Sequence, residues 1–360
     1  MLICLLAASA AAQSSKKIDP EAGYTPVVSL DDKKKKKGDD ITQAPPQSPE
    51  LPSAISAETG RLAYQVSPLS AKGLLSQQTR DALKVLIKTN RGPIIKLRAF
   101  VAGSGDLRRV GEIAGEMFLE KHLPLPVLSV VQVGALPMEG AQVAIEATEV
   151  DRKVVNPYGV AFLSGQSAPS VGQSLEQLKS TLADAGMQAS DALAVTCFIS
   201  SIEDQRDTRQ AMAASFSSVA LNYVQMQRGP VTPAATCEAV ARLRSAPAEP
   251  VTFRNNSQVA LVSSTEVVIT GTQLAFGKQD SDFKLAFDRL GKTLAGAKVR
   301  LDHVVMAHLY VTAGGLSNRV LAIQSAHIAR SPASTLVPFE SLPSLDAVFG
   351  IDVIAVPTLQ

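Results

Sequence analysis

The sequence contains no tryptophan, few aromatic residues of any kind and almost no excess of charge of one sign. Aromatic residues make up 4% of the 360 residues, and the formal net charge at pH 7 is +2. Proteins that bind nucleic acids usually present a basic face together with aromatic side chains on which bases stack. We therefore expect no nucleic-acid partner.

Cysteine and histidine are also scarce, with three and four residues respectively. Cys197 and Cys237 lie in apolar segments typical of strands, where a buried free thiol is common, and we interpret them as free cysteines rather than as a disulfide framework. His303 and His308 lie five residues apart on an extended segment, so they face opposite sides of a sheet. We expect no metal site and no cofactor.

No apolar run is long enough to span a bilayer, which takes about 20 residues, so we expect no stable membrane insertion. The apolar segment Leu2–Ala12 ends in small residues that suit a signal-peptide cleavage site, although no basic residues precede it. Residues 1–12 are predicted to be a signal peptide of a secreted or periplasmic protein; the alternative is a frayed N-terminus on a cytoplasmic one. Residues 13–55, polar and proline-rich, are predicted to be a disordered linker.

The chain does contain enough apolar residues, 46% of the total, for cores of ordinary density. Its length exceeds the roughly 250–300 residues at which one hydrophobic core stops growing, so several domains are expected. The stretch Leu123–Val150 is interpreted as a hairpin of two strands joined at Pro137–Gly140. Similar strands that start at a proline recur at Pro233–Leu243 and Pro332–Pro343, which predicts three copies of one unit.

The expected order in each copy is an amphipathic helix, a central strand, a second amphipathic helix and then the strand that starts at a proline. The predicted central strands are Ile94–Val101, Ala192–Ile199 and Val304–Val311. The predicted domains are residues 56–151, 152–252 and 253–358.

These features resemble the RidA family, also called YjgF/YER057c/UK114, whose members have a chorismate-mutase-like fold. The resemblance rests on Ser164-Gly165-Gln166, on the repeated helix–strand–helix order, on the segment PAATCEAVARL from Pro233 and on GALPMEGAQVAIEA from Gly134. It implies an α+β fold of three tandem domains, each a mixed sheet with two helices on one face. Because family members are usually homotrimers with ligand clefts between subunits, it also implies a monomeric, intramolecular pseudo-trimer.

The best-known activity of the family is hydrolysis of reactive 2-imino acids or their enamines. The family uses an arginine to hold the substrate carboxylate, because a guanidinium group binds a carboxylate bidentately and stays charged. By the resemblance this position falls on Leu128, Ala235 and Ser334, so all three copies lack the arginine.

The acid that orients water in deaminating members corresponds, by the resemblance, to Glu146 and Asp352, with Thr252 as the nearest match in the second copy. The first hypothesis is therefore a divergent hydrolase of small imines or enamines in which Glu146 or Asp352 positions water. The alternative is a pseudo-trimer that binds a small metabolite without catalysis. The expected ligand-binding positions are Ser164, Gly165, Gln166, Leu128, Ala235, Ser334 and Cys237.

Overall fold

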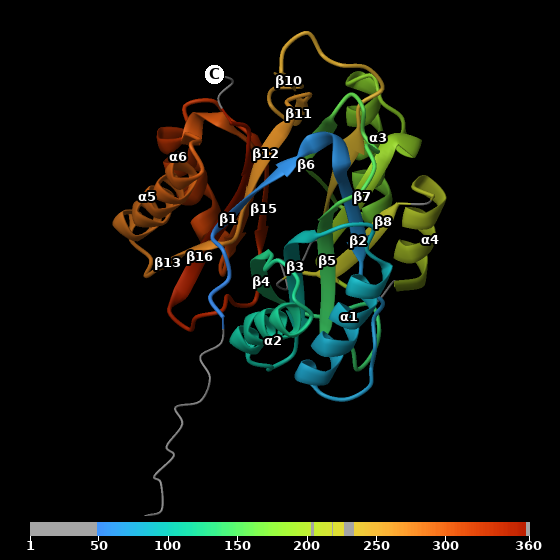
Figure 1. Cartoon of the computed structure of the whole chain (residues 1–360), viewed down its shortest axis with the longest axis vertical. Coiled ribbons are helices and arrows are strands. Elements are labelled where there is room, and N and C mark those ends of the chain that lie inside the picture. Colours follow the sequence, from blue (N-terminus) through green and yellow to red (C-terminus); the bar gives the residue numbers. More distant parts are fainter. Residues whose placement is uncertain (1–48, 203–204, 218, 227–233, 358–360) are drawn as a thin grey trace, which may run out of the picture. The chain divides into compact units, whose positions relative to one another are not determined.

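The computed structural model describes residues 49–202, 205–217, 219–226 and 234–357 (Figure 1). The predicted signal peptide and nearly all of the predicted linker lie outside these residues, and strand β1 (Ala54–Glu58) already begins at the last two linker positions. None of the described helices is both long and apolar enough to cross a membrane. Residues 47–360 form one compact body, and the description below concerns its described residues alone.

This body contains three modules, each with a mixed β-sheet and two α-helices on one face of it, so the fold class is α+β as predicted. The first module has α1 (Leu75–Thr89), α2 (Leu107–Glu120), β2 (Leu62–Val66), β3 (Ile94–Ala102), β4 (Val127–Val133) and β5 (Val143–Val150). The second has α3 (Val171–Asp184), α4 (Gln205–Ser215), β6 (Val160–Ala168), β7 (Ala192–Ile199), β8 (Ala220–Gln225), β9 (Ala235–Arg242), β10 (Val251–Arg254) and β11 (Val259–Val262). The third has α5 (Asp280–Gly296), α6 (Ser317–His327), β12 (Glu266–Thr270), β13 (Gln273–Phe276), β14 (Val304–Val311), β15 (Ala333–Pro338) and β16 (Ala347–Ala355), together with β1.

Local sequence accounts for the helix starts and the central strands. The Ser170 hydroxyl accepts a hydrogen bond from the backbone N–H of Gln173 and the Asp106 carboxylate accepts one from Arg108, so each residue caps the helix that follows. The three predicted central strands are observed as β3, β7 and β14. Side chains alternate along them, with one set packed under the helices and the other facing the neighbouring modules.

The predicted hairpin in Leu123–Val150 is wrong. Strand β3 lies between the two strands, since β4 pairs with it in parallel and β5 pairs with it antiparallel on its other side. The strands β15 and β16 flank β14 in the same way. Proline and glycine in Pro137–Gly140 mark the connection, but they do not specify which strand becomes the neighbour of β5.

The prediction that the Pro233 segment is equivalent to the strands that start near Pro126 and Pro332 is also wrong. The segment that starts at Pro233 forms β9, which is antiparallel to β6 and β7 and therefore corresponds to β5 and β16. The strand that corresponds to β4 and β15 is β8, parallel to β7. A proline followed by alternating apolar residues is compatible with either strand, so the local pattern could not separate them.

Two sheets are completed by strands that lie apart from the rest of the sheet in the sequence. The N-terminal strand β1 is antiparallel to β12 of the third module, as the neighbouring blue and orange strands in Figure 1 show. Strands β10 and β11, the last strands of the second module in the sequence, extend its sheet through β6. The predicted domain boundary at 252/253 falls inside β10, and all three boundaries remain predictions.

The sheet faces without helices pack against one another around two apolar clusters. One cluster contains Ile95, Phe162 and Met306, and the other contains Phe100, Phe198 and Tyr310 at corresponding positions of the three central strands. The rings of Phe100 and Phe198 are 6.0 Å apart between centroids. Along β3 and β14 a charged side chain lies between these clusters, so a polar layer is buried at the junction of the modules.

Candidate functional site

Three carboxylates occupy one register position in the three sheets, each opposite a polar residue of the central strand. The cross-strand pairs are Glu146–Arg98, Glu238–Thr196 and Asp352–His308. Glu238 is thus the counterpart of Glu146 and Asp352 in the second module, and the assignment of that position to Thr252 was wrong. Thr252 lies on β10, which is separated from β9 in the sheet by β11 and β6.

Asp352 is fully buried and accepts four hydrogen bonds. Its Oδ1 lies 2.6 Å from Lys96 Nζ and 2.9 Å from His308 Nδ1, and its Oδ2 lies 2.6 Å from Ser129 Oγ and 2.7 Å from Tyr310 OH. Lys96 and Ser129 belong to the first module, so these bonds join it to the third. A carboxylate offers about four acceptor positions, and all those of Asp352 are used.

Glu146 is saturated in the same way. Its Oε1 accepts from Thr196 Oγ1 and Asn222 Nδ2 of the second module, both at 2.7 Å. Its Oε2 lies 2.7 Å from both Nε and Nη2 of Arg98. Neither of the two acids predicted to orient water has an acceptor position left for water.

Glu238 differs from both. Its Oε1 lies 2.7 Å from Arg98 Nη2 and 3.5 Å from His308 Nε2, so it connects the second module to the first and third. Its Oε2 is buried and has no hydrogen-bond partner among the described residues. The same holds for Arg98 Nη1 and for the hydroxyl of Tyr64.

The buried charges shift one another's pKa values. Burial raises the pKa of a carboxyl group, but the charges of Arg98 and His308 outweigh it and lower the pKa of Glu238 to about 2. Burial is likewise outweighed at Asp352, where Lys96 and His308 hold the pKa well below its usual range. Burial lowers the pKa of His308, yet Glu238 and then Asp352 more than compensate and raise it above its ordinary value.

We call these six residues the charged cluster: Lys96, Arg98, Glu146, Glu238, His308 and Asp352. When His308 is protonated, the cluster contains three positive and three negative groups, and it joins all three modules. Its carboxylates are engaged by these cations, and no group of three or more metal-ligating side chains is found in the part of the chain that the structure describes.

A cavity of about 80 Å³ adjoins the charged cluster, and its wall includes Tyr64, Arg98, Glu146, Glu238 and His308. Nine residues of its wall are half-buried, and one of them, His308, belongs to the third module. The other eight belong to the first and second modules: Tyr64, Gln65, Val66, Glu146, Thr148, Ala194, Ala220 and Val240. The cavity therefore approaches solvent mainly where these two modules meet.

The corresponding places at the other two junctions are closed by close backbone approaches. The N–H of Gly165 donates to Thr335 Oγ1 at 2.9 Å, and a Cβ atom on Gly165 would lie 3.0 Å from the methyl group of the same Thr335. The N–H of Thr272 donates to the carbonyl of Leu128 at 3.2 Å.

The first module has neither a glycine nor a bulge at this point. Val66 lies directly opposite Glu146, whereas the register shifts between Leu163 and Gln166 of β6. Among the described residues beside the cavity, no backbone hydrogen bond joins β2 to the second module. Strand β2 is thus unbroken and carries the branched side chain of Val66 at this point. The cavity remains here, whereas the modules are in contact at the other two junctions.

The predicted ligand-binding positions lie elsewhere. The Gln166 side chain donates to Ser164, and the Ser334 hydroxyl accepts from Gln324 of α6. Leu128, Ala235 and Cys237 pack on the helix side of their sheets. None of the seven lines the cavity, and their role in binding stays a prediction.

The strand register also changes which residue of the second module occupies the position expected for the family arginine. Leu128 pairs with Leu97, Ser334 with Ala307 and Leu221 with Val195, so Leu221 rather than Ala235 is the counterpart in the second module. The family arginine is absent from this position too.

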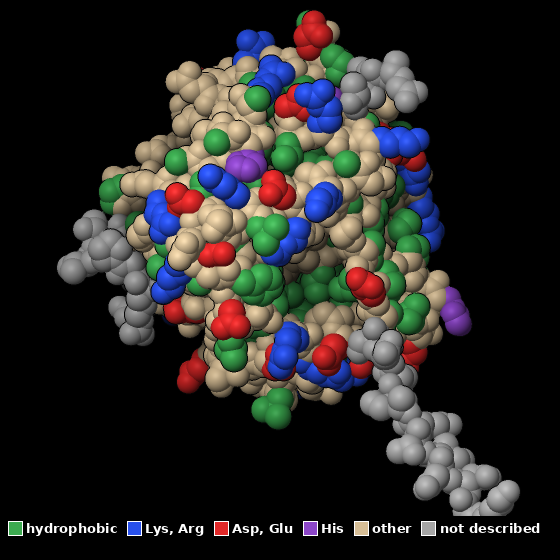
Figure 2. All heavy atoms as spheres, turned by 90° about the vertical axis from the view of Figure 1, so that its left-hand side faces the viewer, with side chains coloured by type: hydrophobic (Ala, Val, Ile, Leu, Met, Phe, Trp, Pro, Cys, Tyr) green, Lys and Arg blue, Asp and Glu red, His purple; other side chains and the backbone are tan. Residues whose placement is uncertain are grey.

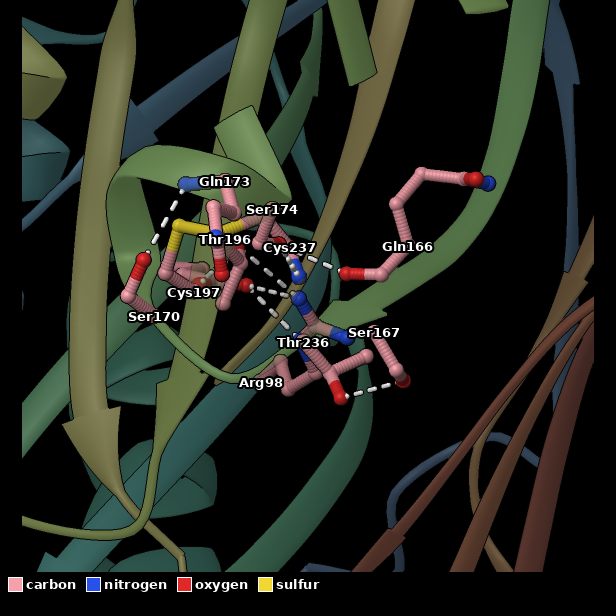
Figure 3. Close-up of a disulfide and its surroundings, with 11 residues drawn as sticks. Arg98, Gln166, Ser167, Ser170, Gln173, Ser174, Thr196, Cys197, Thr236 and Cys237 are labelled. Carbon is pink, nitrogen blue, oxygen red and sulfur yellow. Dashed lines mark hydrogen bonds and ion pairs between the residues drawn. A yellow bond between two sulfur atoms is a disulfide. The ribbon is translucent and has the colours of Figure 1, made fainter. Parts of the chain in front are cut away.

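Cys197 and Cys237 form a disulfide, which corrects the prediction of free thiols (Figure 3). They are cross-strand neighbours on β7 and β9, and both are buried under the helices of the second module. The two strands could not be recognised as neighbours from their apolar pattern, so the pairing was missed. Figure 3 also shows the Ser174 hydroxyl bridging the carbonyl of Gln166 and the N–H of Cys237.

Comparison with known proteins yields a likeness of fold. No protein-family model and no curated protein matches the chain. Rv2704 from Mycobacterium tuberculosis, a member of the YjgF/YER057c/UK114 family, is 20% identical with a TM-score of 0.24, over 25% of this chain and 78% of its own.

Yeast Mmf1 is 20% identical with a TM-score of 0.25, over 32% of this chain and 90% of its own. RidA from an Antarctic Psychrobacter is 17% identical with a TM-score of 0.24, over 30% of this chain and 85% of its own. The chain thus has structural similarity to YjgF/RidA proteins over about 30% of its length in each comparison.

Proposed function

We propose that the chain is a tandem relative of the RidA-fold proteins that binds a small molecule and does not hydrolyse it. The observation that supports this most is the saturation of Glu146 and Asp352, whose acceptor positions are all occupied by side chains. A water molecule could be oriented by either acid only if one of these buried charge-assisted bonds were broken, which costs about 1.5–3 kcal/mol.

The missing arginine supports the same conclusion. Small imino acids offer one strong handle, their carboxylate, and the corresponding residues are Leu128, Leu221 and Ser334. Loss of a charge-assisted bond of about 1.5–3 kcal/mol weakens binding roughly ten- to a hundredfold. Small substrates also lack remote groups whose binding could compensate for this loss.

A hydrolase with a different acid is the second candidate. Glu238 is the one acid of the three with an unpartnered oxygen among the described residues, and it shares the cavity with Arg98. If the chain hydrolyses imines, Glu238 is the residue that would position water.

An assay that couples a pyridoxal-phosphate enzyme, as the source of 2-iminopropanoate, to the release of keto acid separates the two candidates. We expect the purified chain to leave the rate at its uncatalysed value. Acceleration that is lost in Glu238→Gln and kept in Glu120→Gln, an exposed control on α2, would establish the hydrolase and overturn the binding function.

We further propose that the chain is a monomer, with the three modules taking the places of three subunits, and that it is exported. The buried disulfide favours an oxidising compartment such as the periplasm or the cell exterior. Light scattering should give the mass of one chain, and a mass near three chains would contradict the first proposal. Recovery of the protein only from the cytoplasm, with Met1 intact, would contradict the second.

A further inference from the structure

Strand β2 of the first module has one neighbouring strand, β5, among the described residues. The corresponding strands of the other modules, β6 and β12, each pair with a further antiparallel strand on their opposite edge. There Phe162 pairs with Ala260 of β11. Ile269 likewise pairs with Ile55 of β1. Tyr64 occupies the corresponding position of β2, and no strand in the described part of the chain pairs with it on that side.

The order of the strands in the chain accounts for this free edge. Strand β1 precedes β2 but pairs with β12, and β11 precedes β12 but pairs with β6. A strand that completed this pattern would precede β6 and pair with β2. Residues 151–159, which precede β6, form no strand, and the N–H groups of Val155 and Asn156 donate instead to the carbonyl of Gly60, ahead of β2.

The free edge presents backbone hydrogen-bonding groups. The N–H of Ser67 donates to the carbonyl of Ile145 on β5 at 2.8 Å. Successive residues of an antiparallel strand direct these groups to opposite sides, so the N–H and C=O groups of Tyr64 and Val66 point away from β5.

The other two modules show what binds to such an edge. At the position that corresponds to Val66, the N–H of Ser164 donates to the carbonyl of Gln258, just before β11, at 2.8 Å. The N–H of Gly271 donates to the carbonyl of Ser53, just before β1, at 2.9 Å. The N–H of Val66 has no such partner among the described residues. A further extended strand would supply the missing carbonyl group.

The edge of β2 is also the most accessible of the three. Residues 63–66 of β2 are all half-buried. Their counterparts, residues 161–164 of β6 and residues 268–271 at the end of β12, are all buried. This difference is the one expected where a covering strand is present on two edges and missing from the third.

The facing module repeats the difference. Leu193 and Ala194 lie on β7, the strand beside β2, and both are half-buried. Their counterparts Val305 and Met306 are buried on β14, which β11 contacts. Because β6 lies beside β14 and still pairs with β11, a junction of this kind has room for one more strand.

We propose that the free edge of β2 binds an extended peptide segment of another protein, which adds to the sheet as an antiparallel strand. The strands β11 and β1, of four and five residues, indicate the chemistry of that segment. Their side chains in the apolar cluster between the modules are Ala260, Val262, Ile55 and Ala57. The peptide therefore carries small or branched apolar residues at alternate positions, because every second side chain of a strand lies on the same face.

The free edge accepts a single strand rather than a second copy of this chain. Strand β11 pairs with β6 and contacts β14, so a strand at this position lies between two modules. A peptide can enter there, whereas the β2 strand of a second copy is joined to its own sheet. This inference goes beyond the proposed binding of a small molecule and does not depend on it.

The chain itself supplies the probe, a synthetic peptide with the sequence of residues 256–264, which include β11. Since the carbonyl of Gln258 accepts from β6, the N–H of Ala260 also faces β6 and that of Leu261 faces away. We expect NMR titration of the full chain to show saturable binding of this peptide. Methylation of the Ala260 nitrogen should weaken binding roughly three- to tenfold, as loss of one hydrogen bond predicts, and methylation of the Leu261 nitrogen is the matched control.

A variant tests the same bond from the side of the protein. Val66→Pro removes an N–H that faces away from β5, and proline is tolerated on an edge strand in this orientation, so it should weaken peptide binding roughly three- to tenfold. Val66→Ala keeps the N–H and is the matched control. The methylated peptides test the proposal even where the proline variant does not fold.

Amide exchange in the full chain without peptide requires no variant. The amides of Tyr64 and Val66 should exchange at least about a hundredfold faster than those of Phe162 and Ile269, because the latter two belong to covered edges. Addition of the peptide should slow the exchange of Tyr64 and Val66.

Equal weakening by the two methyl groups would overturn the proposal, as would binding that does not saturate below about 1 mM peptide. Slow exchange of Tyr64 and Val66 in the free chain would also overturn it. The edge would then be covered by the chain itself or, where light scattering gives the mass of two chains, by a second copy. Failure of the proposed function is a separate outcome, which would appear as imine hydrolysis.

Discussion

Replacement of Arg98 by methionine should destabilise the protein strongly at neutral pH. The Arg98 side chain is 9% exposed, and its guanidinium lies 2.7 Å from both Glu146 and Glu238 and packs on the Phe100 and Phe198 rings at 5.3 and 5.8 Å. Methionine keeps an apolar side chain beside these rings, but it removes the cation from the half-buried Glu146 and the nearer of two cations from the buried Glu238, which retains His308 at 3.5 Å. Removal of one partner of a buried ion pair costs about 3–5 kcal/mol, and we expect a loss in this range.

The loss should depend on pH in a defined direction. In the wild-type protein the pKa of Glu238 is about 2 against 4.5 for an ordinary glutamate, so its contribution to stability is present above about pH 4.5 and is lost as the pH falls toward 2. Without Arg98 the largest influence that lowers this pKa is lost, so burial should raise the folded pKa of Glu238 from its wild-type value, against the smaller opposing effects of His308 and Thr335. The variant is then penalised at neutral pH and recovers as the carboxyl group takes up a proton in acid.

Urea unfolding at about pH 7.5 and about pH 5 measures both effects. Arg108→Met is the matched control, because the ion pair of Arg108 with Asp106 is exposed and should contribute no more than about 1 kcal/mol. A second change, Glu238→Gln, should restore part of the stability of Arg98→Met by removing an unpaired charge. A loss below about 1 kcal/mol at neutral pH, or a loss that does not change with pH, would refute this account of the charged cluster.

Three further predictions concern other parts of the structure. Because the folded pKa of His308 is raised, its stabilising contribution is complete below about pH 6.5 and is lost as the pH rises through the folded value; His308→Gln should remove this dependence, whose slope is at most about 1.4 kcal/mol per pH unit. Replacement of Cys197 and Cys237 by alanine should lower the free energy of unfolding by about 4 kcal/mol, the chain-entropy value for a separation of 40 residues, and unchanged urea midpoints would contradict the disulfide. Gly165→Val should cost about 1–3 kcal/mol through overpacking against Thr236 of the same module and Thr335 of the third module, whereas Gly172→Ala, where a Cβ atom meets nothing within 4 Å, should not lower the melting temperature.

The three central strands could be predicted from the sequence because they depend on local periodicity. They lie where the pattern predicted them, and Phe100, Phe198 and Tyr310 occupy corresponding positions in them. The neighbours of each strand could not be predicted in this way, since a period of two does not say which strand lies alongside. This is why the predicted hairpin, the role assigned to the Pro233 segment and the prediction of free cysteines were wrong.

The charged cluster was partly visible in the sequence. Lys96 and Arg98 alternate with Leu97 and Ala99 in a strand that is apolar on its other face, which is a signal of a buried polar layer. Glu238 was missed because the strand that carries it was aligned with β4. The partners of the acids lie far from them in the sequence: Lys96 and Asp352 are 256 positions apart. No local pattern encodes a contact over that separation.

Figure 2 shows charged side chains of both signs interspersed over one face of the molecule, with hydrophobic side chains between them. Such a mixture fits the small net charge of +2 and offers no single-sign field along a surface. Among the described residues, six buried or half-buried charged groups gather at the junction of the three modules.

The completion of two sheets by strands that lie apart in the sequence has a consequence for how the polypeptide can be divided. Because β10 and β11 follow Leu243 in the chain yet complete the sheet that contains β6, a cut in the exposed segment 244–249 separates them covalently from the sheet to which they are hydrogen-bonded. The two fragments, each holding a piece of the other's sheet, would recognise each other when produced apart. We therefore expect the two fragments to associate into the native structure. The place of a cut in the sequence does not by itself say which parts of the structure would separate.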